Sequence, residues 1–212
     1  MNRCVILSAG PVEDCSLLRP LLREDDWIIA ADGGERLARD LGIQPNLLVA
    51  DFDSSIPPET AGELEIVRLP AEKDWTDTLA AAMLALERGY REFLLLGCTG
   101  GRLDHTVANF AVLLYLLRHG AAAVLADEQN TLRLFHPGSY QIPKQPGWKL
   151  SLFPYGGDVE GITVKNVRYP LEKARLSPDY PLGVSNEFLD RGAEPAEITF
   201  DKGVLMVFLS KD

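Results

Sequence analysis

Six short apolar runs alternate with helical segments along the first part of the chain, and this alternation most constrains the fold. The runs are apolar along nearly their whole length, as expected of strands in a parallel sheet that is covered on both faces. We predict strands at residues 4–7, 27–31, 47–50, 66–69, 93–96 and 123–126. We predict helices or helical turns at residues 17–23, 35–41, 58–64, 76–88 and 105–118. This order indicates an α/β domain with a mostly parallel sheet flanked by helices.

The composition of the sequence changes after about residue 137, where proline and glycine become frequent. Short apolar runs at residues 149–153, 162–167 and 204–209 lie between these helix breakers. Short strands with regular turn signals predict a small all-β domain, a sandwich or a barrel. We therefore predict two domains, which comprise residues 1–137 and residues 138–212.

Composition excludes several classes of partner. The chain has 212 residues and a formal net charge of -10, whereas nonspecific binding to nucleic acid or to an anionic membrane favours basic surfaces. The apolar run in residues 1–10 is too short for a signal peptide or a membrane span. Three cysteines, Cys4, Cys15 and Cys98, show no paired metal-ligand spacing. Their odd number favours reduced thiols and a cytoplasmic protein.

An acidic pair follows the predicted strand at residues 47–50. In an extended chain the side chains of Asp51 and Asp53 face the same side, and that of Phe52 faces the other. Two adjacent carboxylates repel each other unless a cation or a proton lies between them, and Mg²⁺ prefers such oxygen ligands together with phosphate oxygens. A solvated turn after a strand explains the same residues equally well.

A second acidic motif, residues 72–77, opens the predicted helix at residues 76–88. Asp74 and Asp77 are typical of a capped helix start, where carboxylates complement the helix dipole. The start of a helix also attracts phosphate, which Lys73 would help to neutralise. In that second interpretation Asp77 supplies another metal ligand.

A third motif, residues 97–105, combines paired glycines with a basic and an acidic side chain. Gly100 and Gly101 allow the backbone to approach a bulky anion, whose oxygens exposed amide groups can hold. Arg102 can form two parallel hydrogen bonds with a phosphate. Asp104 either caps the following helix or orients an amine or hydroxyl of a substrate.

A fourth motif, residues 30–34, is either a tight turn with Asp32 as a helix cap or a loop that contacts a nucleotide. All four motifs follow separate predicted strands, where α/β sheets bind their ligands. Their convergence favours a site for a nucleotide with a divalent metal. The phosphate-binding loop of P-loop enzymes and the dinucleotide-binding fingerprint are missing from this sequence, as are protein-kinase signatures.

The sequence resembles the thiamine pyrophosphokinase family in five motifs that keep the family's order and approximate spacing. These motifs are Asp32-Gly33-Gly34, Asp51-Phe52-Asp53-Ser54, Lys73-Asp74-x-Thr76-Asp77, Thr99-Gly100-Gly101-Arg102-x-Asp104-His105 and Gly183-Val184-Ser185-Asn186-Glu187. The resemblance spans nearly the whole chain. It departs from the family only at a variable position, Trp75, and at Ala50, where glycine is commoner.

The resemblance implies an α/β catalytic domain and a β-sandwich that binds thiamine, in a homodimer with thiamine near the subunit interface. It implies that Asp51, Asp53 and Asp77 hold Mg²⁺. The ATP contacts that it implies are Asp32, Gly33, Lys73, Thr99, Gly100, Gly101 and Arg102. The implied thiamine contacts are Asp104, Ser185 and Asn186, and the implied catalytic residues are Asp74, Asp77, Asp104 and Arg102.

The implied reaction is attack of the thiamine hydroxyl on the β-phosphorus of ATP, with AMP leaving. We expect a carboxylate, Asp104 or Asp74, to accept the proton of the alcohol. Two alternatives stay open from the residues. Residues 51–55 also resemble the nucleophile loop of haloacid-dehalogenase-type phosphatases, in which Asp51 would become phosphorylated. The other alternative is a dimer that binds thiamine or a nucleotide without catalysis.

Overall fold

The computed structural model describes residues 3–50, 64–70, 72, 74–189 and 192–212. The chain divides into two compact units, Met1–Glu128 and Gln129–Asp212, which we call unit 1 and unit 2. It is a mixed α/β chain, with parallel strand pairs in unit 1 and antiparallel pairs in unit 2.

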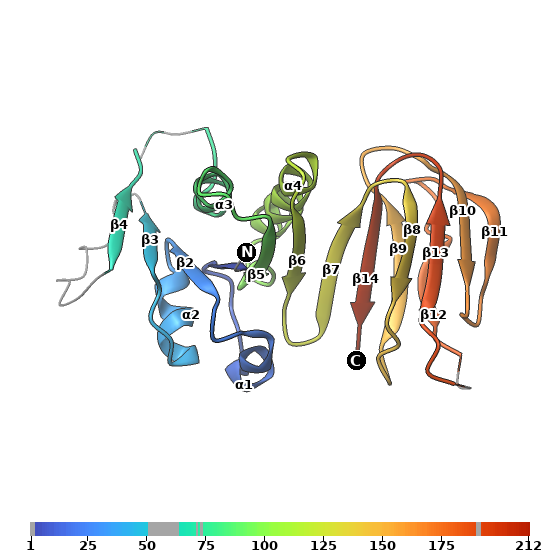
Figure 1. The fold of residues 1–212 in the computed structure, drawn as a ribbon, viewed down its shortest axis with the longest axis horizontal. Coiled ribbons are helices and arrows are strands. Elements are labelled where there is room, and N and C mark those ends of the chain that lie inside the picture. The colour runs from blue at the N-terminus through green and yellow to red at the C-terminus, as the bar shows by residue number, and fades with distance from the viewer. Residues whose placement is uncertain (1–2, 51–63, 71, 73, 190–191) are drawn as a thin grey trace. The chain divides into compact units, whose positions relative to one another are not determined.

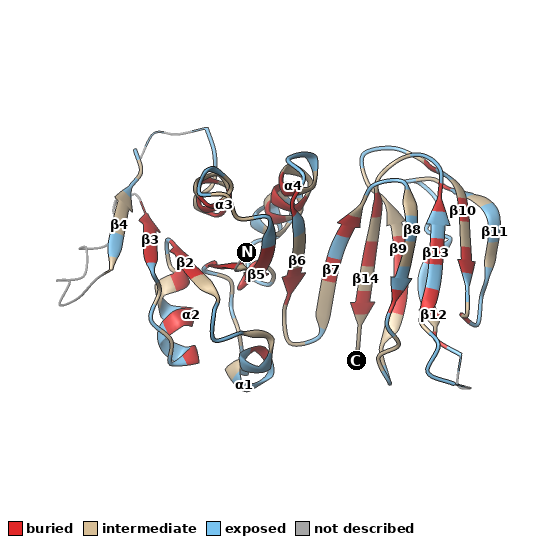
Figure 2. Ribbon diagram, viewed as in Figure 1, coloured by how far each residue is buried: buried red, intermediate tan, exposed pale blue. Residues whose placement is uncertain are grey.

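Unit 1 contains a parallel sheet in the strand order β6-β5-β1-β2-β3-β4 (Figure 1). Its strands are β1 (Cys4–Leu7), β2 (Trp27–Ala31), β3 (Leu47–Ala50), β4 (Glu65–Arg68), β5 (Glu92–Leu96) and β6 (Ala122–Ala126). Every residue of β1 and β3 is buried, as the colour of β3 shows in Figure 2. Continuous burial explains why β1 and β3 are apolar at successive positions. All six predicted strands are confirmed, with bounds that differ by one residue at most.

Helices cover both faces of this sheet, α3 and α4 on one face and α1 and α2 on the other (Figure 1). The helices are α1 (Cys15–Leu18), α2 (Gly34–Leu41), α3 (Asp77–Glu87) and α4 (Leu103–Arg118), with a 3₁₀ turn at Arg19–Leu21. Pro20 lies within that 3₁₀ turn, so the helix predicted at residues 17–23 is only two short turns. The helix predicted at residues 58–64 lies almost wholly outside the described residues. Among the described residues, no helix is long and apolar enough to cross a membrane.

Unit 2 consists of two groups of antiparallel strands. Neighbouring strands follow the order β12-β9-β14-β7 in one group and β11-β10-β13-β8 in the other. The strands are β7 (Asn130–Phe135), β8 (Gly138–Ile142), β9 (Lys149–Pro154), β10 (Val159–Lys165), β11 (Leu171–Leu176), β12 (Gly183–Glu187), β13 (Ala196–Phe200) and β14 (Leu205–Ser210). The predicted runs correspond to β9, β10 and β14. The other five strands were not predicted from the sequence.

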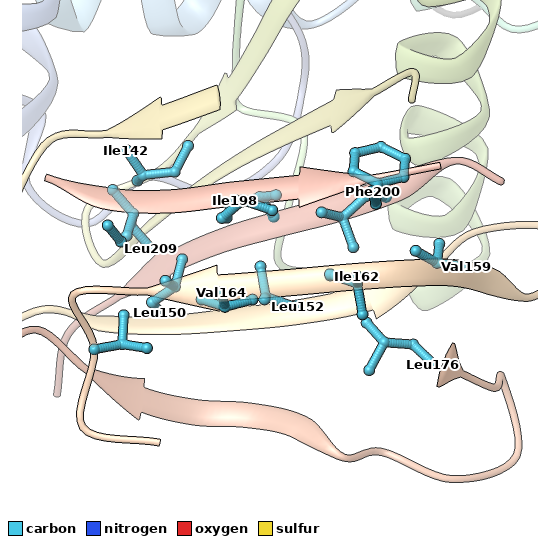
Figure 3. Close-up of a cluster of buried hydrophobic side chains, with 14 of the residues drawn as sticks. Ile142, Leu150, Leu152, Val159, Ile162, Val164, Leu176, Ile198, Phe200 and Leu209 are labelled. Atoms are coloured by element: carbon cyan, nitrogen blue, oxygen red, sulfur yellow. The ribbon is translucent and has the colours of Figure 1, made fainter. Parts of the chain in front are cut away.

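One hydrophobic cluster holds the two strand groups of unit 2 together (Figure 3). Leu150 and Leu152 of β9 belong to it, as do Ile198 and Phe200 of β13, and all four are at most 1% exposed. The buried residues alternate with exposed ones along β13, as expected of a strand with one face in the core.

Candidate active site

A cavity of about 420 Å³ opens at the carboxyl ends of β1, β2 and β5, where α3 and α4 begin. Its walls come from four separate stretches of unit 1. The lining residues are Ser8, Ala9, Gly10, Pro11, Ala31, Asp32, Trp75, Thr76, Asp77, Thr78, Gly97, Cys98, Thr99, Gly100, Gly101, Arg102, His105 and Asn109. This is the edge of a parallel sheet at which ligands bind in α/β folds.

The loops after β1 and β5 approach each other closely enough to require glycine. The amide of Gly10 donates to the carbonyl of Gly97 over 2.7 Å. A Cβ atom on Gly10 would lie 2.5 Å from that oxygen, and one on Gly97 would overlap the carbonyl of Ser8. Gly97, Gly100 and Gly101 also have φ values of 65°, 73° and 64°, which L side chains rarely adopt. Gly100 and Gly101 are exposed, so this part of the loop after β5 presents a glycine backbone of the kind that accommodates anions.

A buried polar cluster supports the floor of this cavity. The hydroxyl groups of Ser8 and Thr78 are 2.9 Å apart, and the thiol of Cys98 donates to Ser8 Oγ over 3.4 Å. Asn109 Nδ2 donates to the carbonyl of Cys98 over 2.8 Å. Burial raises the pKa of the Cys98 thiol to about 12. The thiol is therefore protonated at neutral pH, so Cys98 supports the loop and is not a nucleophile.

Asp77 and Asp32 face the cavity from different elements. Asp77 is the first residue of α3, and its Oδ1 atom is buried. Thr76 caps α3 by accepting the amide of Leu79 over 3.2 Å, so neither acid of the second motif is the cap. Asp32 is exposed and has φ 49°. Its backbone amide donates a hydrogen bond to the carbonyl of Val49, in β3, over 2.8 Å. The cap of α2 is Gly33, without a side-chain bond, so Asp32 as the helix cap is wrong.

Arg102 and Asp104 form an exposed ion pair at the start of α4. Arg102 Nη2 lies 2.5 Å from Asp104 Oδ2, and Arg102 Nε lies 3.1 Å from Asp104 Oδ1. The Arg102 guanidinium lowers the pKa of the Asp104 carboxyl. The helix cap is the backbone of Arg102, without a side-chain bond. Asp104 as the cap is therefore wrong, although its carboxylate accepts the amide of His105 over 3.0 Å.

The cavity brings together six of the residues that the sequence analysis proposed for the site: Asp32, Asp77, Thr99, Gly100, Gly101 and Arg102. Thr99 donates to Asp127 Oδ2 over 2.7 Å, at the end of β6. Gly33, Asp74 and Asp104 lie outside the cavity lining. Three further predictions, Asp51, Asp53 and Lys73, lie outside the described residues. Within the described part of the chain, no three His, Cys, Asp or Glu side chains gather as a metal site.

Ser185 and Asn186 lie in β12 of unit 2, next to a local distortion of the strand. The register between β12 and β9 shifts between Gly183 and Asn186, which marks a β-bulge. Ser185, inside the bulge, is exposed and has φ 56°. Asn186 is only 6% exposed. A left-handed non-glycine residue costs free energy and is typical of functional sites.

Comparison with known proteins gives both units a match. The catalytic domain of thiamin pyrophosphokinase matches residues 18–125, and the vitamin B1 binding domain of the same enzyme matches residues 139–205. The chain is 31% identical to the thiamine pyrophosphokinase of Bacillus subtilis over 220 residues, which cover all of both proteins. The chain belongs to the thiamin pyrophosphokinase family. The resemblance seen in the five sequence motifs is confirmed.

Solved structures named as thiamine pyrophosphokinases share the fold. The Bacillus subtilis structure has a TM-score of 0.88 at 29% identity and covers all of both chains. The Geobacillus thermodenitrificans structure has a TM-score of 0.83 at 30% identity and covers 100% of this chain and 98% of that one. The similarity therefore extends over both units of this thiamin pyrophosphokinase family member.

The sequence analysis missed the loop after β1. Residues 8–11 line the cavity of this thiamin pyrophosphokinase family member, but they contain no charged side chain. The small residues directly after the first buried strand were a usable signal, since a sheet collects its ligand at the ends of several strands. Thr78 and Asn109 were missed because each lies inside a helix, where a polar residue gives no distinctive pattern.

We expect Glu187→Gln to weaken the pH dependence of stability in unit 2. Lys149 and Arg168 bond the two carboxylate oxygens over 2.6 and 2.7 Å, and they lower the pKa of Glu187 from 4.5 to about 2. A lowered pKa in the folded state stabilises the protein above the unfolded value, and this contribution is lost as pH falls through the folded value.

Urea unfolding of the wild type and of Glu187→Gln at about pH 7 and about pH 3 checks this expectation. The wild type should have the higher midpoint near neutrality, and the difference should shrink in acid. Glu172→Gln, at an exposed position of β11, controls for the lost charge. A difference between wild type and Glu187→Gln that stays constant with pH would contradict the expectation.

Proposed function

We infer that the protein transfers the pyrophosphoryl group of ATP to the hydroxyl of thiamine, which gives thiamine diphosphate and AMP. The observation that carries this inference is the match of one chain to both the catalytic and the vitamin B1 binding domain of the family. The phosphatase and the non-catalytic binder are not favoured, because the full-length relative is itself named as a thiamine pyrophosphokinase.

We propose that ATP binds in the cavity of unit 1, with its phosphates against residues 99–101. The backbone amides of this glycine-containing loop are the proposed donors to the phosphates. The guanidinium of Arg102 can form two hydrogen bonds with a phosphate. Lys73, Asp32 and Gly33 complete the proposed contacts with the nucleotide. Because Arg102 pairs with Asp104, a phosphate that binds Arg102 must compete with that carboxylate or share the guanidinium with it.

We propose Mg²⁺ as the metal, held by Asp51, Asp53 and Asp77. The donor set fits the ion, since carboxylate oxygens are the protein ligands that Mg²⁺ prefers. Asp77 lines the cavity, and β3 ends at Ala50, directly before the acidic pair in the sequence. When bound, Mg²⁺ would neutralise phosphate charge and orient the oxygens of ATP. This also reconciles an anionic substrate with a chain of net charge -10.

The proposed chemical step is an in-line displacement. The thiamine oxygen forms a bond to the β-phosphorus, the bond from that phosphorus to the oxygen bridging the α-phosphate breaks, and AMP leaves with that oxygen. A carboxylate, Asp104 or Asp74, accepts the proton of the alcohol. The protein's task is to position the two substrates and to neutralise charge, for which we assign Asp77 and Arg102.

The remaining proposals concern thiamine and assembly. We assign residues 1–137 to catalysis and residues 138–212 to a β-sandwich that binds thiamine, with contacts from Ser185, Asn186 and Asp104. The bulge that exposes Ser185 supports a binding role for β12. We also propose a cytoplasmic homodimer with thiamine near the subunit interface.

Incubation of the protein with thiamine and Mg-ATP, followed by separation of the nucleotides and thiamine phosphates, tests the function. We expect AMP and thiamine diphosphate in equal amounts. ADP with thiamine monophosphate would mean that a single phosphoryl group is transferred. A phosphorylated Asp51 would instead support the phosphatase alternative, and binding of thiamine without turnover would support the non-catalytic one.

A further inference from the structure

The side-chain amide of Asn186 is already engaged by the backbone of unit 2. Its Oδ1 atom accepts the amide of Tyr169 over 3.0 Å and the amide of Glu187 over 2.9 Å. Its Nδ2 atom donates to the carbonyl of Tyr169 over 2.7 Å. The residue is only 6% exposed. A ligand could therefore use this amide only by displacing buried hydrogen bonds, which is costly.

These bonds make the Asn186 side chain act like the peptide group of a neighbouring strand. The segment before Tyr169 continues the pairing along β12, since the amide of Arg168 donates to the carbonyl of Glu187 over 2.8 Å and Val167 forms an antiparallel bridge with Phe188. Asparagine suits this place because a short side chain must offer both a donor and an acceptor. Aspartate supplies only the acceptors when it is ionised.

The strained bulge lies directly before Asn186. Gly183 packs so tightly on β9 that a Cβ atom there would lie 2.9 Å from the Cβ of Leu152. The amide of Ser185 donates to Ser151 Oγ over 3.0 Å. Ser151 of β9 thus holds the bulge by its hydrogen bond with the amide of Ser185. Tyr169 holds Asn186, directly after the bulge, by its backbone hydrogen bonds. Between these two supports, Ser185 stays exposed with φ 56°.

We propose that Asn186 is a positioning residue, which clamps Tyr169 against β12 and thereby fixes the bulge that presents Ser185 to thiamine. The proposal rests on the proposed function and revises one part of it, because it removes Asn186 from the direct contacts with thiamine. The amide acts on the substrate through Ser185. Its loss should weaken the binding of thiamine and leave the site for ATP in unit 1 unchanged.

Asn186→Asp tests the clamp, because it keeps the size of the side chain and removes one donor. The introduced carboxylate would face the carbonyl of Tyr169, so we expect the KM for thiamine to rise about 10-fold at pH 8, with the KM for ATP unchanged.

Asn166→Asp is the matched control. Asn166 Nδ2 also donates to a backbone carbonyl in unit 2, that of Pro195, over 3.0 Å. We expect this variant to lose stability without a change in the KM for thiamine. Ser151→Ala is a second test that leaves Asn186 in place. It removes the acceptor of the Ser185 amide, and we expect it also to raise the KM for thiamine alone.

The outcomes separate the two proposals. If the wild type forms no thiamine diphosphate in this assay, the proposed function fails and the positioning role fails with it. If the wild type is active and Asn186→Asp or Ser151→Ala leaves the KM for thiamine unchanged, only the positioning role is overturned. Equal rises in the KM for thiamine and in the KM for ATP would also overturn it.

Discussion

Asp77→Asn is expected to lower kcat/KM by about 10²–10³-fold while the protein stays folded. The substitution keeps the size of the side chain and removes its negative charge at the wall of the cavity. Thr76 caps α3 and does not depend on Asp77, so the helix should persist. If Asp77 helps to hold Mg²⁺, the variant should also need a higher Mg²⁺ concentration to reach half of its maximal rate.

Initial rates of AMP formation over a series of Mg²⁺ concentrations measure both effects. Asp40→Asn is the control, because it removes the same charge from an exposed position on α2 of the same unit. We expect wild-type rates and Mg²⁺ dependence for the control. A loss of less than about tenfold in Asp77→Asn, or an unchanged Mg²⁺ dependence, would remove Asp77 from the proposed metal site.

Gly97→Ala should have the largest effect on stability, about 2–5 kcal/mol. Two costs combine at this residue. The backbone has φ 65°, which disfavours any residue with a Cβ atom, and the added methyl would overlap the carbonyl oxygen of Ser8. The overlap with the Ser8 carbonyl is hard to relieve by a shift of Ser8. The amide of Ser8 donates a hydrogen bond to the carbonyl of Leu96 over 2.9 Å, and both loops form the wall of the cavity.

Gly120→Ala separates the two costs. Gly120 has φ 73°, and a Cβ atom there would meet nothing within 4 Å. We expect it to lose only about 1–2 kcal/mol, the cost of the left-handed backbone alone. The midpoints of urea unfolding, followed by circular dichroism, measure the difference. Equal shifts for the two variants would show that the loops yield without cost to the added methyl group.

The fold of unit 1 was predictable because burial on both faces leaves a simple signal. β1 and β3 are buried at every position, so their residues are apolar without interruption. In unit 2 the signal is weaker, as β11 shows. Its sequence is Leu-Glu-Lys-Ala-Arg-Leu, and only Leu176 is buried. Antiparallel pairing with β10 holds this strand, and such long-range pairing leaves little trace in local composition.

The candidate site was predictable to the extent that its residues carry charge or paired glycines. Asp32, Asp77 and Arg102, which line the cavity, were proposed because charged residues that follow predicted strands are distinctive, and the topology brings these segments together. The cap of α3 was missed, since Thr76 could be distinguished from the neighbouring acids only by the direction of its side chain. The engagement of Asn186 with Tyr169 depends on a contact between residues 17 positions apart, which no local pattern reveals.

The close approach of the loops after β1 and β5 has a consequence for the affinity of the protein for ATP. The amide of Gly10 donates to the carbonyl of Gly97, and Asn109 Nδ2 donates to the carbonyl of Cys98, so contacts within the protein hold this backbone in place. Ligands that bind a preorganised surface lose less conformational entropy on association. If the phosphates of ATP bind this loop as proposed, a larger share of their contact energy should be retained as affinity, even though the protein carries a net negative charge.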